Sequence, residues 1–153
     1  MKNLYSLFLS QAYKDCWDDY NRLLKLRNFP RWDYVILTAS NEQQAEGFQK
    51  QIEEREKILP KGTKFVVIPD RNGRRVGSGG ATLEVLKYIH EQEETFDGLR
   101  VLVIHSGGDS KRVPQYSALG KLFSPVPHEL PNGRGSALFD EFMICMSSVP
   151  SRI

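Results

Sequence analysis

Two glycine-rich segments carry the residues of this chain that are best suited to chemistry. The first is GSGGAT, residues 77–82, which stands between an apolar run and an amphipathic stretch. Glycine allows positive φ and lets a ligand approach the backbone, and the N–H groups and dipole at the start of a helix attract anions. A tight turn before a helix uses the same residues for geometry alone. The candidates for binding a phosphate or nucleotide in this segment are Gly77, Ser78, Gly79 and Gly80.

The second segment, SGGDSKR at residues 106–112, follows the next apolar run. Because open α/β sheets bind ligands outside the carboxyl ends of their strands, we expect both segments at the same edge. Arg112, together with Lys121 in the sequence GKLFSP, would bring two cations to one polyphosphate held by backbone N–H groups. Neither segment fits G-x-x-x-x-G-K-S/T or G-x-G-x-x-G, which disfavours a P-loop ATPase and a dinucleotide oxidoreductase.

Apolar periodicity predicts the elements that would position these segments. Apolar residues recur at helical spacing over residues 7–26, and Pro30 ends that pattern. Three short apolar runs then alternate with two segments of helical periodicity. The expected strands cover residues 32–39, 64–69 and 99–105, and the expected helices cover 41–59 and 77–94. This order predicts a Rossmann-like α/β fold, a mostly parallel sheet flanked by helices.

The chain divides into an N-terminal helical segment, residues 1–31, and a nucleotide-binding α/β domain, residues 32–153, which we expect to be the front portion of a longer enzyme. Residues 106–127 are dense in Gly, Ser and Pro and predict an active-site loop. Residues 136–146 predict a final helix with Ser136 as its N-cap. On that helix, Asp140 and Glu141 are expected to be exposed.

Composition limits the classes of function. A chain of 153 residues, 40% hydrophobic and 26% charged, is typical of one soluble domain, and a formal net charge of +2 gives no field that would favour nucleic acid or a membrane as partner. Cys16 and Cys145 match neither metal-ligand nor redox spacing and are expected to be reduced thiols in the core. No run approaches the ~18 apolar residues of a membrane helix, and no signal-peptide cleavage site is visible, so we expect a cytoplasmic protein. The sequence sets no oligomeric state.

The histidines have structural explanations. His105 ends an apolar strand, where a histidine is more often a hydrogen-bonded structural residue than a base. His90 and His128 have no partners at ligand spacing, so we predict no metal-binding residues among them.

The order of the motifs resembles a known family. The resemblance begins at Trp32 and is carried by WDYVILTA, VGSGGAT and LVIHSGGDSKRVPQYSALGKLFSPVP. These segments resemble the fucose-1-phosphate guanylyltransferases, also called GDP-fucose pyrophosphorylases, and the pyrophosphorylase half of the bifunctional fucokinase and guanylyltransferase enzymes of bacteria and plants. More distantly, GG-x-S-x-R-x-P followed by GK is similar to the G-x-G-x-R and P-K signature of sugar nucleotidyltransferases. That signature usually follows the first strand of the fold, whereas here it follows the third.

The resemblance implies transfer of GMP from GTP to L-fucose 1-phosphate, which gives GDP-fucose and pyrophosphate. The glycine turn at 77–80 would hold the nucleotide, and Arg112 and Lys121 would stabilise pyrophosphate and the transition state. The triphosphate would be bound by Gly107, Gly108 and Ser110.

The resemblance also implies Mg²⁺ as cofactor, with a carboxylate ligand from a later strand. Because no strand with a terminal aspartate is visible between Lys121 and Ile153, we expect that ligand outside this chain and expect the isolated chain to be inactive. Asp109 is not assigned to metal, since relatives do not need a carboxylate there.

Two other functions stay open. The chain could be part of a bifunctional L-fucokinase, although a kinase would need its own phosphate loop and sugar-binding aspartate, and neither is visible here. It could also be a catalytically silent nucleotide-binding module, which would bind GTP without turnover.

Overall fold

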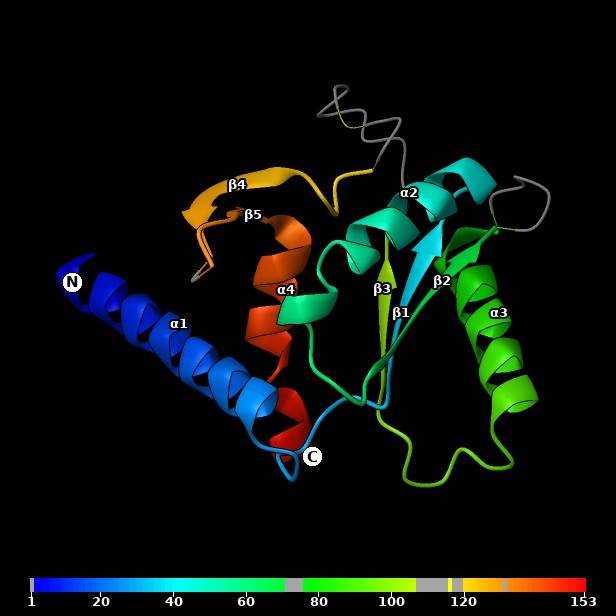
Figure 1. Ribbon diagram of the computed structural model, residues 1–153, viewed down its shortest axis with the longest axis horizontal. Helices are drawn as coiled ribbons and strands as arrows, with labels where there is room; N and C mark the ends of the chain where they lie inside the picture. Colours follow the sequence, from blue (N-terminus) through cyan, green and yellow to red (C-terminus); the bar gives the residue numbers. More distant parts are fainter. Residues whose placement is uncertain (1, 71–75, 107–115, 117–119, 131) are drawn as a thin grey trace.

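The fold is built on a three-stranded parallel sheet. The computed structural model describes residues 2–70, 76–106, 116, 120–130 and 132–153. Strands β1 (Tyr34–Ala39), β2 (Lys64–Pro69) and β3 (Val101–His105) pair in the order β2-β1-β3 (Figure 1). The predicted strands are confirmed, although β1 and β3 begin slightly later than expected.

Helices cover both faces of this sheet. Helix α2 (Glu42–Glu53) follows β1, and helix α3 (Gly77–Gln92) precedes β3. Because successive side chains of a strand point to opposite faces, Val35 and Leu37 pack in one core with α2, whereas Ile36 packs in a second core with α3. Every residue of β1 is therefore buried. These layers confirm the predicted α/β class, a parallel sheet flanked by helices.

A second unit packs beside α2 on the same face of the sheet, and we call it the α1–α4 unit. Its elements are α1 (Lys2–Lys25), the antiparallel strands β4 (Pro125–Glu129) and β5 (Gly135–Ala137), and α4 (Leu138–Met146). Helix α1 packs against α4 and contributes Tyr20 and Leu23 to the core that contains α2 (Figure 1). The division of the chain at residue 31 stays a prediction. Along the part of the chain that is described, no helix combines the length and apolar character needed to cross a membrane.

The prediction for residues 125–146 was partly wrong. Residues 125–127 lie in β4 rather than in a loop, and Ser136, the expected N-cap, lies buried in β5. Helix α4 begins at Leu138 because the Asp140 carboxylate accepts a hydrogen bond from the Ala137 N–H at 2.8 Å, which satisfies a donor that the helix leaves free.

Three further expectations are corrected. The helix expected over 41–59 ends at Glu53 and is followed by the 3₁₀ turn η1 (Glu56–Ile58). A second 3₁₀ turn, η4 (Val149–Ser151), follows α4. Asp140 is buried rather than exposed, because it pairs with a cation inside the protein, and Glu141 is partly buried beneath α1 and the hairpin. Cys145 is exposed and Cys16 partly buried, so neither free thiol lies fully in the core.

Candidate functional site

The carboxyl ends of β1 and β3 lie side by side, and α2 and α3 both begin at this edge (Figure 1). In the last register of the pair, Thr38 of β1 lies opposite His105 of β3. Ligands of open α/β sheets bind at such an edge. We call the following set the carboxyl-edge site: Thr38, Ser40, Gln44, Gly77, Ser78, Gly79, Gly80, Thr82, His105, Ser106 and Gly120.

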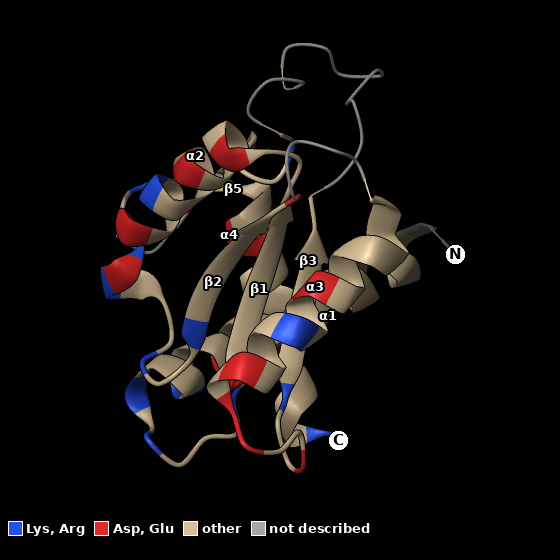
Figure 2. Ribbon diagram, turned by 90° about the vertical axis from the view of Figure 1, so that its right-hand side faces the viewer, with Lys and Arg blue, Asp and Glu red and all other residues tan. Residues whose placement is uncertain are grey.

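The predicted glycine turn forms the first turn of α3. Helix α3 begins at Gly77, and its N-cap, Val76, makes no side-chain capping hydrogen bond. The helix carries no charged side chain before Glu84 (Figure 2). Gly77, Ser78 and Gly79 are exposed. The first N–H groups of a helix have no partner within it, so this end of α3 presents donors and a positive dipole to solvent.

Geometry alone explains two of the three glycines in this turn. Gly77 has φ of +69°, a conformation that other residues rarely adopt, and a Cβ on Gly80 would lie 2.6 Å from the Cβ of Val76. Gly79 is different, because it is helical and a Cβ there would meet no atom of the described residues within 4 Å. A helical glycine costs about 0.5–1 kcal/mol relative to alanine. Packing among the described residues does not explain why a glycine stands at position 79 despite this cost. Access of a ligand to the backbone would explain it.

His105 joins the sheet to this turn. Its Nδ1 lies 3.3 Å from Thr38 Oγ1 on β1, and its Nε2 lies 3.3 Å from Thr82 Oγ1 on α3. The Thr82 hydroxyl also donates to the carbonyl of Ser78 at 2.9 Å. The expectation that His105 is a hydrogen-bonded structural residue is therefore consistent with its contacts, since both ring nitrogens have partners.

Gln44 connects the start of α2 to the residue that follows β1. Its Oε1 accepts from the Ser40 N–H at 2.9 Å, and the Asn41 side chain caps α2 by accepting from the Gln44 N–H at 2.8 Å. The Ser106 hydroxyl donates to the carbonyl of Thr38, which fixes the residue after β3 against the end of β1. Gly120, with φ of +78°, packs on α2 so closely that a Cβ would lie 3.1 Å from Gln44 Nε2.

The structure places only part of the predicted site. Gly77, Ser78, Gly79 and Gly80 lie at the carboxyl edge, and Lys121 is exposed directly after Gly120. The remaining predicted residues lie outside the described part of the chain; they are Gly107, Gly108, Asp109, Ser110 and Arg112. Their convergence with the glycine turn stays a prediction. The sequence reasoning missed Thr38, Gln44 and Thr82 because their contacts join distant segments.

The α1–α4 unit contains a polar cluster that the sequence did not predict. The Glu141 carboxylate accepts from Tyr13 Oη and from Ser136 Oγ, each at 2.6 Å, and His128 Nδ1 lies 3.2 Å from it. Burial and the hydrogen bond to Glu141 raise the pKa of Tyr13 to about 12. Burial works to raise the pKa of Glu141, but the hydrogen bonds from Ser136 and Tyr13 outweigh it and lower that pKa. We call these four side chains the Glu141 cluster.

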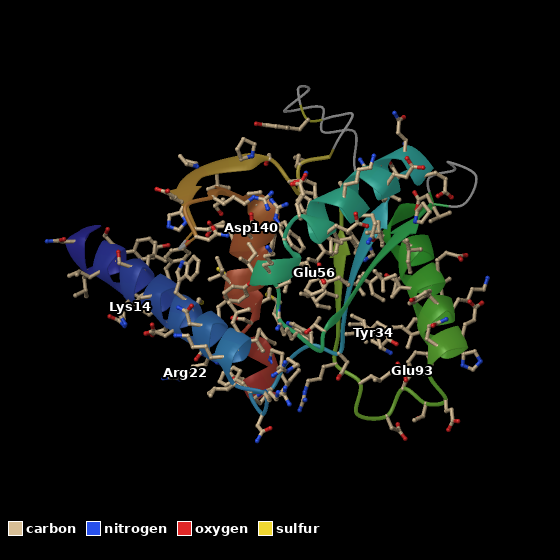
Figure 3. The ribbon with its side chains drawn as sticks, viewed as in Figure 1. Lys14, Arg22, Tyr34, Glu56, Glu93 and Asp140 are labelled. Carbon is tan, nitrogen blue, oxygen red and sulfur yellow. The ribbon has the colours of Figure 1, made fainter. Side chains whose placement is uncertain are left out.

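Two other charged groups lie away from the carboxyl edge. The Arg55 guanidinium donates to both carboxylate oxygens of Asp140, at 2.7 and 3.2 Å, and both side chains are buried. At the opposite end of the sheet, Tyr34 and Lys64 both donate to the Glu93 carboxylate (Figure 3). The partners of these charges are satisfied within the protein, so both groups are structural.

Within residues 2–70, 76–106, 116, 120–130 and 132–153, no group of three or more His, Cys, Asp or Glu side chains could hold a metal ion. We therefore assign no step of a reaction to a metal bound by these residues.

Comparison with known proteins finds a family model that matches part of the chain. Residues 93–153, which include β3, the hairpin and α4, match the family model of the fucose pyrophosphorylase domain. Over these residues, the chain is similar to the fucose pyrophosphorylase family. The predicted resemblance is thus confirmed, and the fucose pyrophosphorylase match includes His105, Ser106 and Lys121 of the candidate site.

Individual relatives extend this similarity towards the N-terminus. The chain is 40% identical over 99 residues to a fucose-1-phosphate guanylyltransferase of Mus musculus, covering 63% of the chain and 17% of the relative. It is 30% identical over 168 residues to a bifunctional fucokinase/GDP-fucose pyrophosphorylase of Arabidopsis thaliana, covering 91% of the chain and 16% of the relative. An L-fucokinase/L-fucose-1-P guanylyltransferase of Bacteroides fragilis is 31% identical over 72 residues, covering 42% of the chain and 8% of the relative.

The chain spans about a sixth of the length of the first two of these relatives. An alignment over 91% of the chain necessarily includes the glycine turn at 77–80, which lies outside the family model. No solved structure matches the chain.

Proposed function

We propose that this chain forms the nucleotide-holding part of a fucose-1-phosphate guanylyltransferase. The reaction is transfer of GMP from GTP to L-fucose 1-phosphate, giving GDP-fucose and pyrophosphate. The family match and the names of the relatives support the reaction class, and the carboxyl-edge site supports the nucleotide-holding role. We also propose a cytoplasmic setting, in line with the composition of the chain.

The observation that carries the proposal is Gly79. It stands in an exposed first turn whose N-cap residue makes no side-chain capping hydrogen bond, and among the described residues neither positive φ nor packing requires a glycine there. Absence of a side chain there leaves the backbone N–H groups open to an anion as large as a nucleotide phosphate.

In the proposed reaction a phosphate oxygen of fucose 1-phosphate attacks the α-phosphorus of GTP. The bond from the α-phosphorus to the bridging oxygen breaks, and pyrophosphate leaves. Such a displacement needs positioning and charge neutralisation more than covalent chemistry. The first turn of α3 would hold the nucleotide, and Lys121 and Arg112 would neutralise the pyrophosphate. Mg²⁺ would add positive charge to the phosphates when bound by ligands other than the described residues.

Calorimetry with MgGTP, MgATP and fucose 1-phosphate tests the binding step. Gly79→Ala is expected to weaken MgGTP binding by about tenfold, because the added methyl group covers the N–H groups. The matched control is Gly47→Ala, since Gly47 is also helical and also has no atom within 4 Å of a Cβ. Both variants are expected to stabilise the fold by about 0.5–1 kcal/mol, and only Gly79→Ala is expected to lose affinity.

Three outcomes would contradict the proposal. Equal MgGTP affinity of the two alanine variants would remove the role of the glycine turn. A preference for MgATP would overturn the guanylyl assignment. Binding of MgGTP without pyrophosphate release, in a full-length relative carrying the same residues, would favour a silent nucleotide-binding module.

A further inference from the structure

With His105 neutral, the hydrogen bonds around its ring have one consistent set of proton positions. A threonine hydroxyl has one proton to donate, and that of Thr82 goes to the carbonyl of Ser78. Thr82 Oγ1 must therefore accept from His105, so Nε2 of the ring carries the proton. In the neutral ring Nδ1 is then free to accept from the Thr38 hydroxyl.

These bonds form one continuous relay from the sheet to the glycine turn. Thr38 donates to His105, His105 donates to Thr82, and Thr82 donates to Ser78 in the first turn of α3. The relay thus connects the central strand β1 to the first turns of α3 through side chains. Thr38 is buried at 7% exposure and belongs to the fully paired β1, so the relay begins at a fixed point.

We propose that His105, as the tautomer with the proton on Nε2, is a positioning residue that holds the first turn of α3 against the carboxyl edge so that its N–H groups face the nucleotide. This inference rests on the proposed nucleotide-binding role of that turn. With both ring nitrogens engaged, His105 positions the turn and takes no proton from a substrate.

Two substitutions separate the two halves of the relay. The amide nitrogen of Gln occupies about the place of Nε2, so His105→Gln can still donate to Thr82. The shorter Asn of His105→Asn reaches only the place of Nδ1, so it keeps the contact with Thr38 and loses the contact with Thr82. The control is His90→Asn, because His90 lies near the far end of α3 and stacks on Phe96.

The first measurement is MgGTP affinity by calorimetry on the whole chain. His105→Asn is expected to weaken binding about three- to tenfold, the range of one lost hydrogen bond, while His105→Gln and His90→Asn stay within about twofold of the unmodified chain. Thr82→Val is expected to cause the same loss as His105→Asn, and the double variant no further loss, since both break one relay. Equal affinity of His105→Asn and His105→Gln, or additive losses in the double variant, would overturn the inference.

The second measurement needs no nucleotide. Hydrogen exchange is expected to accelerate at the amides of Ala81 and Thr82, the first that donate within α3, in His105→Asn and not in His105→Gln. If the unmodified chain binds no MgGTP, the proposed function fails, and exchange still decides whether His105 positions the turn. Unchanged exchange in His105→Asn would show that it does not.

Discussion

The α1–α4 unit and the carboxyl-edge site differ in how their polar groups are held. At the first, Asp140 of α4 is joined by two hydrogen bonds to Arg55, the residue before η1, and both side chains are almost fully buried. The Arg55 guanidinium lies 5.0 Å from the centre of the Phe123 ring. In the second, His105 is exposed and its two contacts are 3.3 Å long. In the first arrangement the polar groups are paired inside the protein and stabilise the fold, whereas the second leaves donors available at the surface.

This difference distinguishes a region that stabilises the fold from a region that can bind a ligand. Buried, paired charges tolerate no loss of a partner, because the remaining charge cannot reach water. An exposed turn whose N-cap residue makes no side-chain capping bond contributes little to folding, yet the first N–H groups of a helix are what an anion requires. Substitutions in the two regions should therefore separate stability from binding.

The largest effect is expected from Arg55→Met. It leaves the Asp140 carboxylate buried at 5% exposure without its cation, which we expect to destabilise the fold by about 3–5 kcal/mol in urea or thermal unfolding. The control is Arg134→Met, because Arg134 pairs with Glu54 at the surface and such pairs contribute about 0–1 kcal/mol. Equal losses in the two variants would remove the distinction between buried and exposed pairs.

A companion variant sharpens this result. Adding Asp140→Asn to Arg55→Met removes the unpaired charge and keeps an oxygen for the Ala137 N–H, so the double variant is expected to be more stable than Arg55→Met alone. A double variant less stable than Arg55→Met would show that the charge of Asp140 is not the source of the loss.

An intermediate effect is expected at Gly120, which packs on α2 at the carboxyl edge. Gly120→Ala is expected to cost about 1–3 kcal/mol in thermal unfolding, because φ is +78° and the new Cβ would lie 3.1 Å from both Gln44 Nε2 and Phe48 Cζ. Gly133→Ala is the matched control, since Gly133 has the same φ and its nearest atom would be 3.6 Å away. A cost at Gly120 no greater than that at Gly133 would mean that Gly120 is not packed against α2.

Much of the sheet could be predicted from the sequence because its signals are local. Residues 64–69 are an apolar, β-branched run between polar turns, and β2 covers those same residues. The hairpin could not be predicted in this way. Pro125 and Pro127 lie in β4, and proline in a short run indicates a loop unless the run is an edge strand, which β4 is in its two-stranded sheet.

The candidate site likewise has a part that the sequence predicts and a part that it does not. The glycine turn is visible in the sequence because glycine and its place before a helix are local features. The partners of His105 are not, since Thr38 lies 67 residues away and Thr82 lies 23 residues away along the chain. Arg55 and Asp140 are 85 residues apart, and no spacing rule joins them. Contacts of this kind depend on the order of the strands and on the packing of α4, which only the folded chain shows.

The smallest effect is expected from the Glu141 cluster, and it depends on pH. Because the folded protein lowers the pKa of Glu141 below its ordinary value of 4.5, the ionised carboxylate stabilises the fold above that value. As the pH falls through the lowered pKa, this stabilisation is lost. Glu141→Gln is therefore expected to cost about 1 kcal/mol at neutral pH, and the difference from the unmodified chain should shrink as the pH falls below about 4.5.

The groups that face Glu141 are Tyr13 from α1, His128 from β4 and Ser136 from β5. Tyr13→Phe removes one donor and keeps the ring. The pH-dependent stabilisation by the Glu141 carboxylate should therefore become smaller without disappearing. Denaturant unfolding of both variants between pH 7 and acid conditions measures this directly. If the stability difference between Glu141→Gln and the unmodified chain grew on acidification, the fold would be stabilised more by the protonated carboxyl group than by the carboxylate. Ser136 and Tyr13 would then not be donors to an ionised Glu141.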